Sequence, residues 1–379
     1  MFYSLFPLAG TKLQRIIHPG LQDFYVKRIT TLCGLNRDHV KFPGANPVSM
    51  MRRDLEEIRN SQKSIPWMVT EKSDGLRLLL VLTMSPQCEP VALLVDRSYG
   101  IYILPGILFL PHIFVLGTII DTELILEKPI AEEMASLGTR PTLWLLLCFD
   151  LLVLAGENCC RAPFVQRHEM LSSLLDACYK PQIGVDVCIL RLKIFYPLSE
   201  LKHLCEDIIP ELHHENDGLI IMKGNSTYKA GMQKTTLKWK EKSKHSVDFL
   251  CHLHKIVESQ KQWMFGIYVN DVAGKAVLAN YILISESDLQ RLGLRNFYEL
   301  ELSIVECFWS DETGWRPERL RHDKKEANYE NTLRKTVDNI SENITLQELM
   351  QVKPEPSAQV LCPTDDEEEF ELLEEVFGN

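Results

Sequence analysis

The sequence lacks the patterns that mark several classes of protein. Its eleven cysteines include no Cys-x-x-Cys pair, so no zinc-binding framework is expected. Several cysteines lie inside apolar runs such as Leu147-Cys148-Phe149, which is typical of buried free thiols in a reducing compartment. The N-terminal segment MFYSLFPLAG contains no basic residue and does not resemble a secretory signal. We therefore expect an intracellular protein without structural disulfides.

One apolar run is long enough to raise the question of a membrane span. Residues 101–120 carry almost no charge, and about 20 apolar residues suffice to cross a bilayer. Pro105 and Pro111 interrupt the run, however, and Asp121 follows it directly. We therefore expect two buried strands joined by turns, and no membrane partner.

The acidic charge is concentrated at the C-terminus. The formal net charge is −11, and eight acids with no base among them lie at the very end of the chain. They are Asp365, Asp366, Glu367, Glu368, Glu369, Glu371, Glu374 and Glu375. Without them the net charge is only −3, so a locally basic cleft for phosphate groups remains compatible with the composition. This tail could be a solvated charge run, a docking peptide, or a segment that occupies the protein's own basic cleft.

The length of 379 residues predicts two or three domains. From Trp67 onward the pattern is rich in short strands joined by turns, which indicates an antiparallel sheet rather than a βαβ array. Strands are expected at 67–70, 76–83, 91–96, 143–154, 218–223 and 236–240, and helices at 50–60, 166–178 and 199–208. Residues 1–65 otherwise show only short apolar pieces and turns.

The pattern changes after Lys244. About a hundred residues there contain short strands at 247–254, 263–269, 276–284 and 301–309, which suits a small β-barrel. Residues 330–351 are expected to be helical, and Pro354 and Pro356 begin a flexible tail. The segment Trp315–Lys325, taken alone, would be a solvated charged loop.

The sharpest motif is Glu71-Lys72-Ser73-Asp74-Gly75-Leu76-Arg77. A lysine at a strand end, then a tight turn, then an arginine on the next strand could direct both cations into one cleft. Lys-x-Asp-Gly alone is too short to be specific, and a hairpin with exposed charges is the alternative.

A second basic element lies at Leu237-Lys238-Trp239-Lys240. On a strand its two lysines share one face, where they repel each other unless an anion lies between them, and Trp239 points to the opposite face. The stretch from Lys223 to Lys244 holds seven lysines against one acid, Glu241, which indicates a local phosphate-binding surface. An exposed basic strand edge is the alternative.

Carboxylates stand at the ends of predicted strands, in Asp121-Thr122-Glu123 and Asp217-Gly218. Carboxylates near lysines suit a magnesium-dependent phosphate chemistry, because the ion takes carboxylate and phosphate oxygens together. Each could equally be a strand-ending turn.

Together these segments resemble the covalent nucleotidyltransferase superfamily, which contains mRNA capping enzymes and polynucleotide ligases. Six motifs occur in the family's order: Lys72-Ser73-Asp74-Gly75, Asp121-Thr122-Glu123, Cys148-Phe149-Asp150, Asp217-Gly218-Leu219-Ile220, Leu237-Lys238-Trp239-Lys240 and Arg321-His322-Asp323-Lys324. The segment from Phe42 to Met50, Val95-Asp96-Arg97 and the final Arg-x-Asp-Lys element are similar to the capping guanylyltransferase branch. Two positions depart from the family's pattern: Thr122 replaces the usual glycine and Ala327 a frequent proline.

The resemblance implies an α+β fold, with an antiparallel-sheet nucleotidyltransferase domain and a C-terminal OB-fold β-barrel lid. We expect the domain boundaries at 1–243 for the GTP-binding catalytic domain, 244–330 for the lid, 331–352 for a C-terminal helix and 353–379 for the acidic tail.

The resemblance also implies a role for each matching residue. Lys72 would form a lysyl-GMP, and Asp217 would support a divalent ion, Mg²⁺ or Mn²⁺. The residues expected to bind GTP are Arg77, Arg97 and Glu123 at the ribose, Phe149 and Lys193 at the guanine, Lys238 and Lys240 at the α-phosphate, Asp248 beyond that strand, and Arg321, Asp323 and Lys324 on the lid.

The function implied by the resemblance is mRNA guanylyl transfer, in which GMP passes from GTP to 5′-diphosphate RNA. The alternatives are an ATP-dependent RNA or DNA ligase and a catalytically silent capping scaffold. No Cys-x5-Arg phosphatase element occurs, so we expect a separate RNA 5′-triphosphatase partner. The resemblance further implies docking on the phosphorylated C-terminal tail of RNA polymerase II, and hence a nuclear location.

Overall fold

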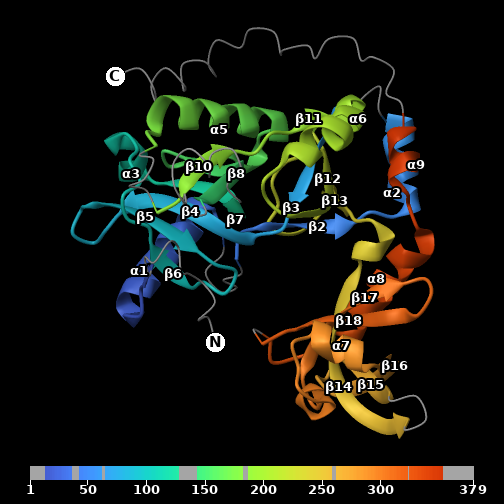
Figure 1. Cartoon of the computed structure of the whole chain (residues 1–379). Coiled ribbons are helices and arrows are strands. Elements are labelled where there is room, and N and C mark those ends of the chain that lie inside the picture. Colours follow the sequence, from blue (N-terminus) through green and yellow to red (C-terminus); the bar gives the residue numbers. More distant parts are fainter. Residues whose placement is uncertain are drawn as a thin grey trace, which may run out of the picture. The chain divides into compact units, whose positions relative to one another are not determined.

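The structure is a computed structural model that describes residues 13–35, 42–61, 65–127, 143–181, 187–257, 262–322 and 324–352. The chain divides into two compact units (Figure 1). In the larger unit, Glu56–Trp239 pack with the described residues that precede Ser49, and the smaller unit combines Ser49–Leu55 with Lys240–Gln351.

The larger unit contains an eight-stranded sheet in the order β1-β6-β5-β4-β7-β8-β10, with β9 paired to β8. Its strands are β1 (Gln14–Arg15), β4 (Leu76–Met84), β5 (Pro90–Val95), β6 (Ile101–Ile103), β7 (Thr118–Glu127), β8 (Leu143–Leu154), β9 (Glu157–Asn158) and β10 (Ile189–Leu192). All pairs are antiparallel except β8 with β10, which run parallel. Seven of the nine residues of β4 are buried in succession, as expected of a strand covered on both faces.

A second, five-stranded sheet of the larger unit has the order β11-β3-β12-β13-β2. Its strands are β2 (Ala45–Ser49), β3 (Trp67–Ser73), β11 (Tyr196–Pro197), β12 (Asn216–Lys223) and β13 (Gly231–Trp239). The turn Ser73-Asp74-Gly75 connects β3 in this sheet to β4 in the other, so the two sheets meet at this motif. A Cβ at Gly75 would lie 2.5 Å from the carbonyl oxygen of Leu124, so only glycine allows the turn to approach β7 this closely.

The helices of the larger unit include two that the sequence did not indicate. They are α1 (Pro19–Leu32) and α3 (Pro111–Leu116), beside the expected α5 (Phe164–Cys178) and a short irregular helical segment at 198–211 that includes α6 (Leu201–His203). Two strands fall in 101–120 as expected, namely β6 and the start of β7 at Thr118, but they are separated by a helix as well as turns, because Pro111 stands at a helix start that proline favours. None of the helices in the described ranges is both long enough and apolar enough to cross a membrane.

The smaller unit is built on a five-stranded antiparallel sheet in the order β16-β15-β14-β17-β18. Its strands are β14 (Ser246–Val257), β15 (Gln262–Asn270), β16 (Ala276–Ile284), β17 (Ile304–Ser310) and β18 (Gly314–Leu320). The core contains Phe249, Phe265 and Cys307, all fully buried. Within the described residues the sheet is not closed, because β16 and β18 stay at its two edges. The charged segment that, taken alone, would be a loop begins within the strand β18, whose Trp315 is buried.

Helices complete the smaller unit. They are α7 (Glu286–Arg291), α8 (Glu330–Glu342) and α9 (Leu346–Met350), and α2 (Arg52–Ser61) begins among its residues. Arg52 explains why this early segment belongs here: its backbone N–H donates to Glu342 at 2.6 Å, and its guanidinium contacts Glu348 at 2.9 Å. Helix is found in 330–350 as expected.

Candidate active site

A cavity of about 180 Å³ opens in the larger unit where the two sheets meet. The last residues of β3 line it, together with side chains from β4, β7, β8 and β12. Six of the residues that the sequence predicted for the site line this cavity: Lys72, Arg77, Arg97, Glu123, Phe149 and Lys193. Segments far apart in sequence therefore converge on one site, with Lys72 among them.

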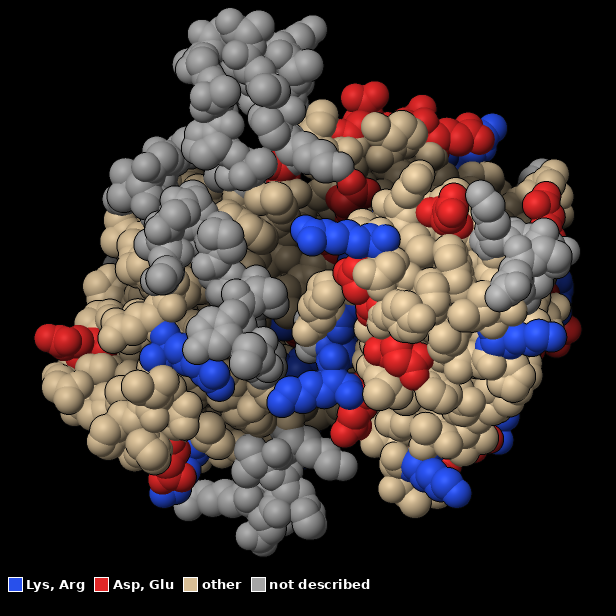
Figure 2. All heavy atoms as spheres, turned by 60° about the horizontal axis from the view of Figure 1, so that its bottom comes forward, with Lys and Arg blue, Asp and Glu red and all other residues tan. Residues whose placement is uncertain are grey.

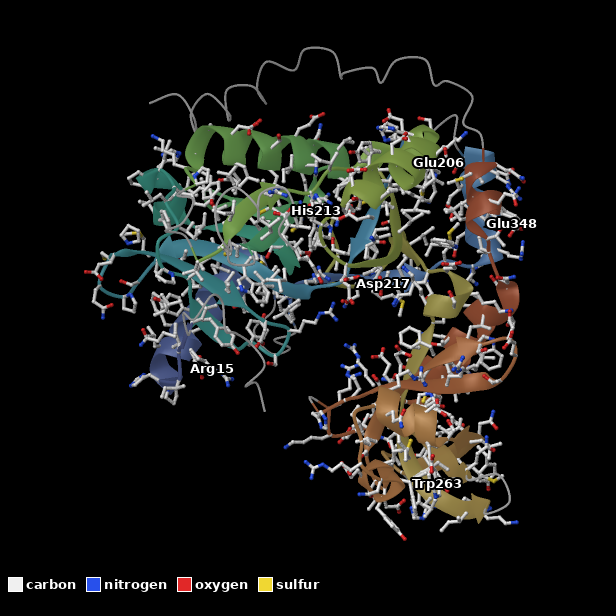
Figure 3. All side chains as sticks on the ribbon, viewed as in Figure 1. Arg15, Glu206, His213, Asp217, Trp263 and Glu348 are labelled. Atoms are coloured by element: carbon white, nitrogen blue, oxygen red, sulfur yellow. The ribbon has the colours of Figure 1, made fainter. Side chains whose placement is uncertain are left out.

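Lys72 is paired with Asp217. Its Nζ donates to Oδ1 of Asp217 at 2.6 Å, and the two side chains are 23% and 22% exposed. The pairing of β12 with β3 is irregular between Asn216 and Leu219, and Gly218 has a φ of +149° that favours glycine. This irregularity lets Asp217, labelled in Figure 3, reach the lysine ammonium.

Strand register places Lys238 on the same face of the second sheet as Thr70 of β3. Ile220 of β12 pairs with Thr70 of β3 and with Lys238 of β13, and directly opposed residues of a sheet share a face. Lys238 therefore shares a face of the sheet with Thr70 and Ile220, which line the cavity, but it is not among the described residues that line the cavity. Trp239 is buried and lies on the other face, as predicted. Lys240 follows directly after β13.

The lysine-rich stretch does not form one continuous basic surface. Lys223 pairs with Glu57 at 2.5 Å in the larger unit, and Lys242 pairs with Asp311 at 2.6 Å in the smaller one. On the face that Figure 2 displays, basic and acidic side chains are interspersed. Two of the seven lysines of this stretch are therefore paired with carboxylates.

Phe149 is the extra residue of a β-bulge. Between β7 and β8, Asp121 pairs with Asp150 and Thr122 pairs with Cys148, so Phe149 has no partner across the strands. A bulge redirects a side chain, and here the phenyl ring lines the cavity. The Arg77 guanidinium lies 5.6 Å from the centre of this ring, within the range of a cation–π contact.

Arg77 is held by protein groups on several sides. Its Nε donates to Oδ1 of Asp121 at 2.8 Å, a second nitrogen binds the other carboxylate oxygen, and a third binds the carbonyl of Ala45. The Tyr228 hydroxyl donates to Asp121 and accepts from the backbone N–H of Ala45 at 2.9 Å. This buried network fixes Arg77 beneath Phe149. Sequence reasoning did not identify Tyr228, since no motif includes it.

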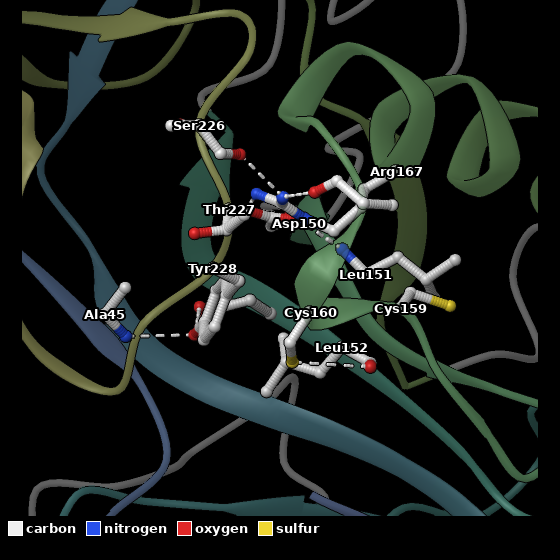
Figure 4. Close-up of polar contacts among 12 residues, drawn as sticks. Ala45, Asp150, Leu151, Leu152, Cys159, Cys160, Arg167, Ser226, Thr227 and Tyr228 are labelled. Carbon is white, nitrogen blue, oxygen red and sulfur yellow. Dashed lines mark hydrogen bonds and ion pairs between the residues drawn. The ribbon is translucent and has the colours of Figure 1, made fainter.

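A second buried ion pair, between Arg167 and Asp150, lies next to the bulge (Figure 4). Arg167 of α5 binds Asp150 through Nε at 2.7 Å and a terminal nitrogen at 2.9 Å, and its other terminal nitrogen donates to the carbonyl of Ser226 at 2.9 Å. The Arg167 side chain is only 1% exposed. Nothing in the sequence distinguished it from the surface cations of a helix.

Lys193 lies in a third buried cluster, which also includes Glu71. Its Nζ donates to Oε1 of Glu71 and, at 2.5 Å, to the hydroxyl of Ser73. Burial alone would raise the pKa of Glu71, but hydrogen bonding from His214 and the charge of Lys193 lower it to about 2. Burial lowers the pKa of Lys193, and the Glu71 charge opposes that change. Sequence reasoning missed Glu71, although it precedes the predicted nucleophile directly.

Glu123 differs from the other charged residues of the cavity. Its carboxylate has no hydrogen bond or ion pair to the residues that the structure describes. Burial raises the pKa of Glu123 to about 7, against the opposing charges of Arg77, Lys193 and Lys72. A carboxyl group without a hydrogen-bond partner among the described residues is available to a ligand hydroxyl.

Replacing Glu123 with glutamine is expected to stabilise the protein at pH 8 but not at pH 5. The pKa of Glu123 rises on folding from 4.5 to about 7. Between these pH values the folded state therefore keeps a proton on Glu123 that the unfolded state has lost. Stability therefore falls as pH rises through that window, and glutamine removes this loss. Thermal unfolding at several pH values measures the effect, with Glu127→Gln on the same strand as the control. A difference in melting temperature that does not change with pH would contradict the prediction.

The remaining predicted residues that the structure describes lie in the smaller unit. Asp248 binds Arg321 at 3.0 Å and also contacts the Lys324 ammonium, while its backbone N–H donates to Asn328 at 2.9 Å. These three predicted GTP-binding residues are thus brought together with one another. Asp323 lies outside the described residues.

No group of three or more His, Cys, Asp and Glu side chains suited to holding a metal occurs in the described part of the chain. The ten cysteines described there are all unpaired thiols.

Comparison with known proteins decides the family. Residues 16–242 match the mRNA capping enzyme catalytic domain, and residues 244–350 match the mRNA capping enzyme C-terminal domain. The chain belongs to the mRNA capping enzyme family. It is accordingly an mRNA guanylyltransferase that uses GTP.

Relatives of this capping enzyme extend over most of its length. It is 29% identical to the mRNA-capping enzyme subunit alpha of Neurospora crassa, over 83% of this chain and 85% of the relative. It is 26% identical to the mRNA-capping enzyme subunit alpha of Schizosaccharomyces pombe, over 86% and 83%. A solved mycobacterial DNA ligase D complexed with ATP is 15% identical over 75% of this chain and 96% of that one, with a TM-score of 0.36. The family match favours guanylyl transfer over the ligase alternative.

Proposed function

We propose that Lys72 is the nucleophile of guanylyl transfer. Its Nζ would attack the α-phosphorus of GTP, a P–N bond would form, and the P–O bond to pyrophosphate would break, with loss of a lysine proton. The 5′-diphosphate of RNA would then displace lysine and yield the GpppN cap. The observation that carries this proposal is that Lys72, with Asp217 in contact, borders the cavity that also holds Arg77, Arg97, Glu123, Phe149 and Lys193.

The charges around Lys72 suit this chemistry. A lysine with a pKa of ~10.4 is protonated in neutral water and must lose its proton before it can attack. Lys238 projects from the same face of the sheet as Thr70 and Ile220. Lys238 and Lys240 would also bind the α-phosphate, whose negative charge rises as the bond forms.

The base and the ribose would occupy the rest of the cavity. Phe149 would stack on guanine, because the bulge directs its ring there. Lys193 would donate to the guanine O6, and Arg97 and Glu123 would hold the ribose. Arg77 was expected to contact the ribose as well; its bonds to Asp121 and Ala45 favour a role in holding Phe149.

We propose that the smaller unit is an OB-fold lid, with boundaries near 244 and 330 and the larger unit as the nucleotidyltransferase domain over 1–243. Its five-stranded antiparallel sheet and buried core are compatible with that fold. Arg321, Asp323 and Lys324 would orient the β- and γ-phosphates. Asp248 would hold Arg321 and Lys324 ready, since it contacts both. Lid opening and closing would then separate the two steps of the reaction.

A divalent ion, Mg²⁺ or Mn²⁺, fits the site only as a companion of the nucleotide. Mg²⁺ is commonly bound by one or two carboxylates together with substrate phosphates. Asp217 supplies a partly exposed carboxylate beside Lys72. When bound, the ion would neutralise phosphate charge.

The partners follow from the reaction and from the relatives. Two relatives are named as alpha subunits, so we infer a second subunit, an RNA 5′-triphosphatase that prepares the diphosphate end. Docking on the phosphorylated C-terminal tail of RNA polymerase II would bring the enzyme to new transcripts, in the nucleus.

The test is to incubate the protein with α-labelled GTP or ATP and Mg²⁺, and to separate it on a denaturing gel. We expect label from GTP only, and transfer of that label to 5′-diphosphate RNA but not to 5′-monophosphate RNA. Label from ATP would indicate a ligase. Nucleotide binding without label would indicate the silent scaffold.

A further inference from the structure

A buried cluster beside the cavity joins β3 to the segment that follows β10. It consists of Glu71, Ser73, Lys193 and His214. Lys193 donates to Glu71 and to Ser73 at 2.5 Å, Ser73 donates to Glu71 at 2.9 Å, and Nε2 of His214 lies 3.4 Å from the same carboxylate oxygen. The Lys193, Glu71 and His214 side chains are only 7%, 9% and 7% exposed. A charged cluster this deep has little access to water.

The backbone of Lys193 is fixed as firmly as its side chain. Its N–H donates to the carbonyl of Cys148 at 2.8 Å, next to the bulged Phe149, and its carbonyl lies 2.8 Å from Nε2 of His168. The ammonium position is therefore set relative to the ring that we propose stacks on the base. Precise placement of this kind is what discrimination between similar ligands requires.

The ammonium of Lys193 has one donor left for a ligand. A lysine ammonium has three N–H groups, and two of them go to Glu71 and Ser73. The third has no acceptor among the residues that the structure describes, and Lys193 lines the cavity. A group that only donates prefers a base with an oxygen at that edge and rejects one with an amino group there.

The carboxylate of Glu71 is what keeps Lys193 in that donor-only state. Burial favours the neutral amine, which can accept a hydrogen bond as well as donate one. The negative charge of Glu71, in direct contact, opposes this effect by raising the pKa of Lys193. Glu123 also raises that pKa, and Lys72 lowers it. Three other groups hold the Glu71 carboxylate in place. Thr70 hydrogen-bonds to one of its oxygens, and Ser73 and His214 contact the other.

We propose that Glu71 and His214 are positioning residues that set the base preference of the enzyme by holding Lys193 as a fixed donor. This inference rests on the proposed function, in which Lys193 contacts the base. The strand β3 therefore carries both the proposed nucleophile and residues that position Lys193, because alternate side chains of a strand face opposite ways. Lys72 points toward Asp217, whereas Glu71 and Ser73 point toward Lys193.

The test compares how unlabelled nucleotides compete with α-labelled GTP for adduct formation. The competitors are ITP, which has the 6-oxygen, and ATP and 2-aminopurine riboside triphosphate, which lack it. For the unaltered enzyme we expect ITP to compete far better than the other two. Glu71→Gln should reduce that advantage by about tenfold or more, the effect of losing a charged hydrogen bond, and His214→Phe by about threefold. The Glu71→Gln enzyme should regain part of the advantage at lower pH, where Lys193 is protonated again.

A double-mutant cycle separates positioning from general damage. In a Lys193→Met background, Glu71→Gln should have no further effect on the ratio between competitors. Glu127→Gln is the matched control, because it breaks the surface pair with Arg191, two residues before Lys193, and should leave the ratio unchanged. Thermal unfolding checks each variant, and His214→Phe carries the test if Glu71→Gln does not fold.

Two outcomes would overturn the inference. One is an equal fall for all competitors in Glu71→Gln and His214→Phe. The other is a change of the ratio by Glu71→Gln that persists without Lys193. Failure of the proposed function is distinguishable, since the unaltered enzyme would then form no adduct with GTP at all.

Discussion

Lys72→Arg is expected to abolish the GMP–protein adduct, with a loss of more than about 1,000-fold. Arginine keeps the positive charge and can still bind Asp217, but its guanidinium does not lose its proton at accessible pH and so has no free electron pair. Charge and fold are thus retained while the nucleophile is removed. The measurement is adduct formation from α-labelled GTP on a denaturing gel.

The control for this variant is Lys234→Arg. Lys234 lies on β13 and is exposed, with no ion pair to the residues that the structure describes. We expect it to label normally. Equilibrium binding of GTP should survive in Lys72→Arg within about tenfold, because the cavity is otherwise intact. An adduct that persists in Lys72→Arg would assign the covalent bond to another residue.

Arg167→Met is expected to cause the largest loss of stability, about 3–5 kcal/mol. It leaves the Asp150 carboxylate buried without the two hydrogen bonds at 2.7 and 2.9 Å that now compensate its charge. Because Asp150 directly follows Phe149, adduct formation should fall too, mainly through weaker GTP binding. Urea unfolding and the dependence of labelling on GTP concentration measure the two effects.

Two further variants make this prediction specific. Asp150→Leu combined with Arg167→Met should recover most of the lost stability, since removing both charges leaves none unpaired. Arg191→Met breaks a surface pair, with Arg191 53% exposed, and should cost less than about 1 kcal/mol. A double variant as unstable as Arg167→Met would show that packing, not charge, supports the bulge.

Much of the fold could be read along the chain. The apolar residues in β3, β4, β5 and β8 and the turn at Asp74-Gly75 place these elements within a few residues of their observed bounds. The helix α1 was missed because its buried side chains, Tyr25 and Ile29 among them, alternate with other apolar residues that blur the helical period. The charged segment that contains β18 would be a loop if taken alone, but pairing with β17 overrides its polar composition.

The site was only partly predictable for a related reason. Lys72, Glu123 and Phe149 stand in short motifs, so a pattern indicates them, and the cavity includes all three. Glu71, Arg167 and Tyr228 act through partners on strands and helices that are distant in sequence. No local pattern contains both partners of such a contact.

The order and spacing of the motifs identify the chemistry from the amino-acid chain alone, because a reactive lysine, its neighbouring cations and the carboxylates must each occur on suitable strand ends. Which charges neutralise one another was decided only by folding. Asp217 pairs with Lys72, Arg167 with Asp150 and Glu71 with Lys193 because strand register, a bulge and an irregular pairing bring them within hydrogen-bonding distance. Burial makes each of these charges need its partner, because an unpaired charge in the protein interior raises the free energy of the folded state by a large amount.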